Sequence, residues 1–174
     1  MKKLSKLFIA VLFTAIAFTS CKKNSDNSPA GSTMTFTANG KAVTFNTCVA
    51  VTASLNDVEQ VMITGTNLTN GSPGVVSFEV EITHALATLK AGQTYPVGTS
   101  FAQQNASVFY YFTSSDNVAV SQPGKPVGTV TLTEVTSTSI KGTFSGKLFA
   151  QDDFDGTTLL YTIAGGSFTA KISK

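Results

Sequence analysis

The fold class of this 174-residue chain is decided by the segment Val75-Val76-Ser77-Phe78-Glu79-Val80-Glu81-Ile82-Thr83. Apolar and polar side chains alternate along it, with Phe78 and Val80 on one side and Glu79 and Glu81 on the other. Successive side chains of a β-strand point to opposite faces, so a period of two is typical of a strand that is buried on one face. We therefore predict a half-buried antiparallel strand whose glutamates face solvent, where carboxylates also discourage aggregation.

The same period of two recurs through the chain after Ser32, where Thr, Val, Phe and Ile predominate. The dipeptide Asn39-Gly40 between two such runs is a strong signal for a tight hairpin turn, which needs two residues with positive φ. No helical periodicity follows, apart from a single turn that His84–Lys90 could form. We expect strands at residues 33–38, 41–53, 58–67, 75–83, 95–98, 107–113, 118–120, 127–135, 140–150 and 157–172.

Short strands at this regular spacing predict an all-β fold. We expect an antiparallel β-sandwich of about nine or ten strands, with a partly closed β-barrel as the alternative. Parallel βαβ units are excluded, because the chain has no long helical crossovers.

Individual residues sharpen this expectation at three places. Pro96 has no amide N–H, so the segment 95–98 is expected at a sheet edge, and Gly165-Gly166 predicts a break in the last strand. The run 41–53 is interpreted as one continuous strand with Cys48 on its polar face. Its apolar face would then carry Val43, Phe45, Val49 and Val51.

The N-terminus has the layout of a secretory signal. Lysines at positions 2, 3 and 6 give a positive start, the apolar run 7–18 follows, and small residues precede Cys21. With a cysteine directly after the cleavage point, the segment resembles a bacterial lipoprotein signal, whose cysteine is acylated and becomes the mature N-terminus. The alternatives are an ordinary cleaved signal and a transmembrane anchor, although the run has 12 residues and a spanning helix needs about 20.

The sequence divides into three predicted parts. Residues 1–20 are the lipoprotein signal peptide, residues 21–32 are the lipidated cysteine and a flexible tether, and residues 33–174 are a single β domain. The tether has no large apolar side chain, so it cannot bury enough surface to fold. Stable anchoring needs more than one acyl chain, a condition that a multiply acylated Cys21 would meet.

The charge of the domain excludes nucleic acid as a partner. The whole chain has a net charge of +2, but five of its 12 lysines and one of its 10 acidic residues lie before Gly31. The remaining seven lysines and nine acidic residues leave the domain near −2, and there is no arginine. A nucleic-acid-binding face needs basic residues to neutralise phosphates, and arginine is its commonest base reader.

After processing, Cys48 is the one cysteine besides the acylated Cys21, so an internal disulfide is excluded and stability must come from packing. We interpret Cys48 as a half-buried strand residue. A reactive or intermolecular thiol is the alternative.

The densest acidic cluster is Asp152, Asp153 and Asp155. Such a turn can offer several oxygens to Ca²⁺, which takes six to eight. The EF-hand pattern fails, however, because Gln151 stands at its first ligand position and Thr162 at its last. We expect a hairpin tip, with a weak calcium site as the alternative, and we predict no cofactor and no other metal site.

The chain lacks the residue patterns of common enzymes. Glu79 and Glu81 would have Cα atoms about 7 Å apart on one strand face, which overlaps the carboxylate separation of glycoside hydrolases, yet we interpret them as a solvated face. His84, the sole histidine, has no nucleophile elbow to serve and too few N or S partners for zinc. We expect no catalytic residues, and a hydrolase is the alternative.

Aromatic residues gather in the middle of the chain at Tyr95, Phe109, Tyr110 and Tyr111. Flat rings can stack on sugars, and tyrosine is enriched at protein interfaces. These four are the candidate ligand-binding residues for glycan or protein. The competing interpretation is a central strand that is buried on both faces.

Five motifs carry a resemblance to a known group. They are Lys22-Lys23 after Cys21, Phe36-Thr37-Ala38-Asn39-Gly40-Lys41, Ala91-Gly92-Gln93-Thr94-Tyr95-Pro96, Ile140-Lys141-Gly142-Thr143-Phe144-Ser145-Gly146 and Gly165-Gly166-Ser167-Phe168-Thr169-Ala170-Lys171-Ile172. Together they resemble a group of small uncharacterised all-β lipoproteins from the Bacteroidota, over most of the mature chain. The resemblance implies the compartment and the fold; because the group has no established activity, it carries over no functional residues.

We expect a lipid-anchored protein of the cell envelope that acts as a non-catalytic binding module for glycan or protein. The alternative is a structural or assembly subunit that pairs through an exposed strand edge. The membrane contact is expected through the acylated Cys21, at the outer membrane. Surface-exported lipoproteins of the resembled group often carry an acidic cluster soon after the cysteine, whereas Lys22-Lys23 comes first here, which favours the periplasmic face.

Overall fold

The computed structural model describes residues 31–55, 58–67, 76–98, 105–114, 117–121, 125–153 and 155–173. The predicted signal peptide, Cys21 and the tether up to residue 30 lie outside these residues. In the part of the chain that is described, no helix has the length and hydrophobicity that crossing a membrane requires.

The described residues form eleven strands and one short 3₁₀ helix, which confirms the all-β prediction. The elements are β1 (Thr33–Ala38), β2 (Lys41–Phe45), β3 (Thr47–Leu55), β4 (Val58–Thr66), β5 (Ser77–Thr83), η2 (Leu86–Thr88), β6 (Thr94–Val97), β7 (Ala106–Phe112), β8 (Val118–Val120), β9 (Gly128–Val135), β10 (Ser139–Ala150) and β11 (Leu159–Ile172).

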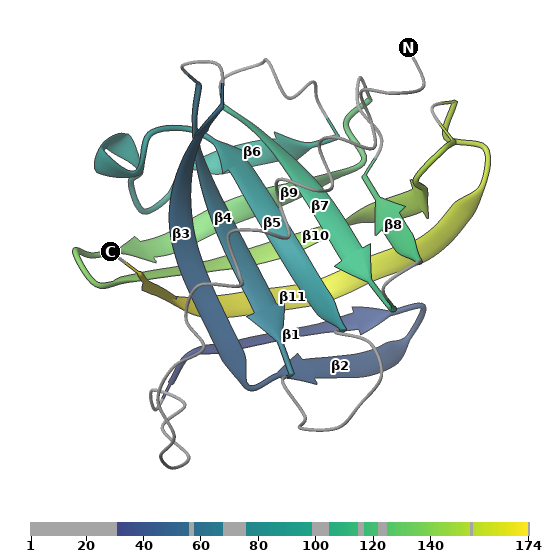
Figure 1. Ribbon diagram of the computed structural model, residues 1–174, viewed down its shortest axis with the longest axis horizontal. Coiled ribbons are helices and arrows are strands. Elements are labelled where there is room, and N and C mark those ends of the chain that lie inside the picture. Colours follow the sequence, from purple (N-terminus) through teal and green to yellow (C-terminus); the bar gives the residue numbers. More distant parts are fainter. Residues whose placement is uncertain are drawn as a thin grey trace.

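The strands belong to one hydrogen-bonded sheet that folds over into two layers (Figure 1). In the front layer β3, β4, β5 and β7 run side by side, and β9, β10, β11 and β1 run across behind them. Ladder pairs link eight strands into a circuit in the order β11, β3, β4, β5, β7, β6, β9, β10 and back to β11. The arrangement has the two layers of the predicted sandwich, and its sheet edges are linked as in the predicted alternative, a partly closed β-barrel.

Two links in this circuit are parallel, and both are short. β3 joins β11 through two residue pairs, and β6 joins β7 through the single pair Val97 and Ser107. The other ladders among the described residues are antiparallel, as the sequence predicted.

Phenylalanine rings from both layers meet in the interior. The Phe78 ring of β5 lies 4.7 Å from that of Phe36, 5.2 Å from that of Phe144 and 5.4 Å from that of Phe109, measured between ring centroids. All four rings are buried. Aromatic pairs at such separations contribute about 0.5–1.5 kcal/mol beyond the area that they bury. The strand with the clearest alternation therefore supplies the central ring of the core.

Glycines of the second layer leave room for buried phenylalanine rings. A Cβ atom added to Gly142 would lie 2.5 Å from the Phe168 ring and 2.7 Å from the carbonyl oxygen of Thr131. One added to Gly166 would lie 2.6 Å from Phe144. All three distances are well below van der Waals contact, so these positions require glycine because neighbouring rings and a backbone oxygen occupy the space.

The predicted hairpin at Asn39-Gly40 is confirmed, with φ of 50° and 78°. The Asn39 side chain also fastens this turn to β11. Its amide nitrogen donates to the carbonyl oxygen of Leu160 at 2.8 Å, and its oxygen accepts from the Thr162 N–H at 2.8 Å.

The prediction of one continuous strand over residues 41–53 is wrong. The chain bends at Asn46, which separates β2 from β3 and shifts the alternation by one residue. As a result Cys48 is fully buried in the core together with Phe45, whereas Val49 and Val51 lie half-buried on the outer side.

The prediction that Pro96 lies at a sheet edge is also wrong. β6 pairs with β9 on one side and touches β7 on the other. The missing N–H is tolerated because the β7 link is a single residue pair, and the Ser107 hydroxyl donates to the Pro96 carbonyl oxygen at 3.1 Å.

Gly165-Gly166 is a β-bulge and not a break. β11 continues through it, while its register shifts against both β1 and β10. Gly165 has a φ of 59°, a conformation that glycine adopts without steric cost.

Gly142→Ala is expected to lower the free energy of unfolding by about 1–3 kcal/mol, because the added methyl group overlaps the Phe168 ring and a backbone oxygen. Urea denaturation measures the change. Ser145→Ala, at an exposed position of the same strand, is the control and should stay within about 0.5 kcal/mol of the wild type. Equal stability of the Gly142→Ala variant and the wild type would contradict the packing described.

Candidate functional site

β5 is buried on both faces, and the predicted solvated carboxylate face is wrong. Glu79 and Glu81 are 4% and 5% exposed. Their ladder partners on the neighbouring strands include Met62, Val108 and Tyr110. Alternation within one strand cannot reveal this, since it reports only that the two faces differ.

Ladder register identifies the neighbours of the two glutamates. Opposed residues of a ladder present their side chains to the same face. Thr64 and Tyr110 therefore flank Glu79, and Met62 and Val108 flank Glu81. We call this surface the outer carboxyl face, formed by Gln60, Met62, Thr64, Glu79, Glu81, Val108, Tyr110 and Phe112.

The hydrogen bonds of this face leave one acceptor unused. The Thr64 hydroxyl donates to Glu79 Oε2 at 3.2 Å, and Gln60 makes a side-chain hydrogen bond with Glu81. Glu79 Oε1 is buried and accepts no hydrogen bond. Neither glutamate forms an ion pair with a described lysine; the ion pair within the described residues joins Lys141 to Glu134.

Burial dominates the ionisation of this face. It raises the pKa of Glu79 from 4.5 to about 7, against a smaller opposing effect of the Thr64 hydrogen bond. The pKa of Glu81 rises to about 7 through burial and the nearby charge of Glu79, opposed by the Gln60 hydrogen bond. Burial and the two carboxylates also raise the pKa of Tyr110 well above its ordinary value. The face therefore exchanges protons near neutral pH.

Two aromatic rings border the carboxyl pair. Tyr110 and Phe112 lie two residues apart on β7, so they share a face, and their rings stack with centroids 6.3 Å apart and planes at 23°. Tyr110 is the ladder partner of Glu79. An aromatic surface thus lies beside Glu79.

The four predicted ligand-binding aromatic residues are divided by the sheet. Tyr95, Phe109 and Tyr111 are 2%, 0% and 7% exposed and belong to the core. They cannot stack on a ligand while the core is intact. Tyr110 lies on the outer carboxyl face, because side chains of β7 alternate between the two sides. β7 thus matches the competing interpretation, a central strand that is buried on both faces.

The acidic cluster forms the predicted hairpin tip between β10 and β11. The Asp153 carboxylate accepts hydrogen bonds from the N–H groups of Gly156 and Thr158 and from the Thr157 hydroxyl, and these bonds, led by that of Thr158, lower the pKa of Asp153. Asp152 and Asp155 are exposed. Within the described residues, no three His, Cys, Asp or Glu side chains lie close enough together to hold a metal ion.

Cys48 and His84 both have structural contacts. Cys48 is a strand residue as predicted, but it is fully buried and not half-buried; burial raises the pKa of its thiol to about 12, which disfavours the alternative of a reactive thiol. The His84 ring packs edge-on against Tyr95, and its Nδ1 hydrogen-bonds with the Thr88 hydroxyl at 2.8 Å, so it holds η2 on the domain.

An open depression lies beside η2 and the turn between β9 and β10. Its lining includes Leu86, Leu89, Val135, Thr136 and Ile172.

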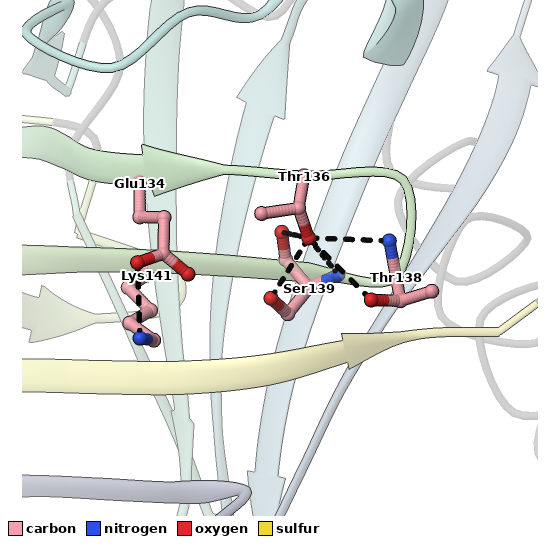
Figure 2. Close-up of polar contacts among 5 residues, drawn as sticks. All are labelled: Glu134, Thr136, Thr138, Ser139 and Lys141. Carbon is pink, nitrogen blue, oxygen red and sulfur yellow. Dashed lines mark hydrogen bonds and ion pairs between the residues drawn. The ribbon is translucent and has the colours of Figure 1, made fainter.

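The polar groups at this turn bind one another, as Figure 2 shows. Thr136 Oγ1 accepts hydrogen bonds from the N–H groups of Thr138 and Ser139, at 3.2 and 2.9 Å. Lys141 pairs with Glu134 across the hairpin at 3.1 Å. These contacts hold the turn itself, so the outer carboxyl face is the stronger candidate site.

Comparisons of the chain with protein-family models, with curated proteins and with solved structures found no match. The resemblance to lipoproteins of the Bacteroidota therefore stays a prediction. The fold and the geometry define an all-β domain with a carboxyl-bearing, partly aromatic outer face.

The double variant Glu79→Gln, Glu81→Gln is expected to change how stability depends on pH. Between pH 4.5 and about 7 the unfolded chain releases protons that the folded chain retains, so the stability of the wild type is full below pH 4.5 and falls until the pH reaches about 7. A shift of this size corresponds to at most roughly 3 kcal/mol for each group. The variant should therefore melt several degrees above the wild type at pH 8 and close to it at pH 4.5.

Thermal unfolding across this pH range measures the effect. Glu59→Gln, at an exposed position of β4, is the control and should keep the pH profile of the wild type. Parallel profiles for the double variant and the wild type would show that the two carboxyls are not desolvated.

Proposed function

We propose that the protein is a lipid-anchored binding protein of the bacterial cell envelope, which holds a glycan or protein ligand on its outer carboxyl face. The anchor is the acylated Cys21, and the tether that follows links it to the β domain. The proposal places the domain at the outer membrane, on the periplasmic side. Its support is the signal layout of residues 1–20 and the Lys22-Lys23 pair that takes the place of an early acidic cluster.

The observation that carries the proposal is the buried carboxyl oxygen Oε1 of Glu79, which has no hydrogen-bond partner. No described strand or helix lies in front of β4, β5 and β7 in Figure 1. A buried polar group without a partner costs roughly 1–3 kcal/mol, and more if it is charged. Departures of this kind from the rules of folding concentrate at functional sites. A ligand that supplies the missing contacts would offset the cost.

The edge of β2 is less suited to binding than this face. β2 pairs with β1 on one side. On its other side the Asn67 side chain accepts from the Asn46 N–H at 3.0 Å and donates to the Thr44 carbonyl oxygen at 2.8 Å. A partner strand would need these same backbone groups. The capped edge therefore favours binding through the face over assembly through strand pairing.

Replacing Met62, which lies half-buried on the outer carboxyl face, with a photo-crosslinking amino acid should trap the ligand in intact cells. We expect a discrete adduct on illumination. An adduct that protease digestion reduces to the cross-linked peptide would be protein, and one that resists digestion would be glycan.

The same replacement at Thr133, an exposed residue of β9, is the matched control and should give no such adduct. Cys21→Ala should release the protein from the membrane fraction and weaken the Met62 adduct. Identical adducts from both positions would overturn the proposed face, and membrane fractionation unchanged by Cys21→Ala would overturn the lipid anchor.

A further inference from the structure

We infer that the outer carboxyl face binds the side chain of a lysine on a partner protein, with its ammonium group between Glu79 and Glu81. This inference rests on the proposed function and names the chemistry of its ligand. It selects protein over glycan, and it assigns each part of the lysine side chain to a part of the face.

The charge of the face calls for a compact cation with several donors. Glu79 and Glu81 stand on the same side of β5, with Cα atoms about 7 Å apart. Glu79 Oε1 lacks a hydrogen-bond donor, and neither carboxylate has a described lysine beside it. An ammonium group carries three donors on one point charge, so it can reach an oxygen of each carboxylate at once.

The apolar part of the face fits the rest of a lysine side chain. Met62 lies half-buried beside Glu81 and can cover the methylene stem, which lysine commonly lays along apolar surface. Tyr110, the ladder partner of Glu79, adds aromatic surface beside the carboxyl pair. A divalent metal fits less well, because Ca²⁺ takes six to eight oxygens and the described residues hold no cluster of three acidic or other metal-binding side chains.

Binding of an ammonium group should release protons from the face. The pKa values of Glu79 and Glu81 are both about 7, so each carboxyl is largely protonated at pH 6 and largely ionised at pH 8. A cation binds the ionised forms. Its affinity should therefore rise with pH, by about tenfold over this range for each proton that is displaced.

The test uses the purified full chain and a blocked oligolysine peptide, with affinity measured by calorimetry at pH 6 and pH 8. We expect an affinity at least about tenfold higher at pH 8. Glu79→Gln combined with Glu81→Gln should abolish this gain, while Glu59→Gln should bind like the wild type. A norleucine counterpart of the peptide, which has the stem without the charge, should not bind.

Three outcomes would overturn the inference. The first is an affinity for the peptide that does not change between pH 6 and pH 8, and the second is tighter binding of amino-sugar oligomers than of the peptide. The third is peptide binding that is seen only after both tether lysines are replaced, by Lys22→Gln and Lys23→Gln. The last would identify the chain's own tether as the occupant. If any of these occurs while the Met62 adduct persists, the lysine assignment fails and the proposed binding face stands; loss of the Met62 adduct would remove both.

Discussion

The contact between the Phe78 ring and the rings of Phe36, Phe109 and Phe144 is the interaction on which the rest of the structure depends. It joins β5 and β7 of the front layer to β1 and β10 behind them. Space for aromatic rings comes from the second layer, where Gly142 and Gly166 carry no side chain. Because side chains alternate along a strand, an inward Phe78 fixes Glu79 on the outside. The core thus determines where the carboxyl groups lie.

The core determines that Glu79 and Glu81 face outward, but it does not explain why these positions carry carboxyl groups. Folding requires that the outward positions of β5 be compatible with a strand, and threonine or serine would serve as well as glutamate. Two desolvated carboxyls, one with an oxygen that accepts no hydrogen bond, lower stability at neutral pH. A binding role would explain why the two carboxyl groups are present, because a cationic ligand would supply the positive charge and the hydrogen-bond donors that the fold does not provide.

The sequence was most informative where the cause is local. Period two predicted the strands, and Asn39-Gly40 predicted a hairpin, because both depend on neighbouring residues. Cys48 was placed on the wrong face because the bend at Asn46 depends on Asn67, which lies 21 residues away. The outer carboxyl face was missed for a similar reason, since the residues beside the two glutamates, such as Met62 and Val108, lie on other strands. One signal was present: β7 is apolar on both faces, so the surface beside Glu79 could not be fully solvated.

Carbodiimide labelling of carboxyl groups in the folded full chain, read by mass spectrometry, tests the central claim most directly. That claim is that β5 carries two desolvated glutamates opposite an aromatic core. It predicts that Glu59 and Glu134, which lie outside the face, are modified at least about tenfold faster than Glu79 and Glu81, and that unfolding removes the difference. Equal rates for all four glutamates in the folded protein would contradict it.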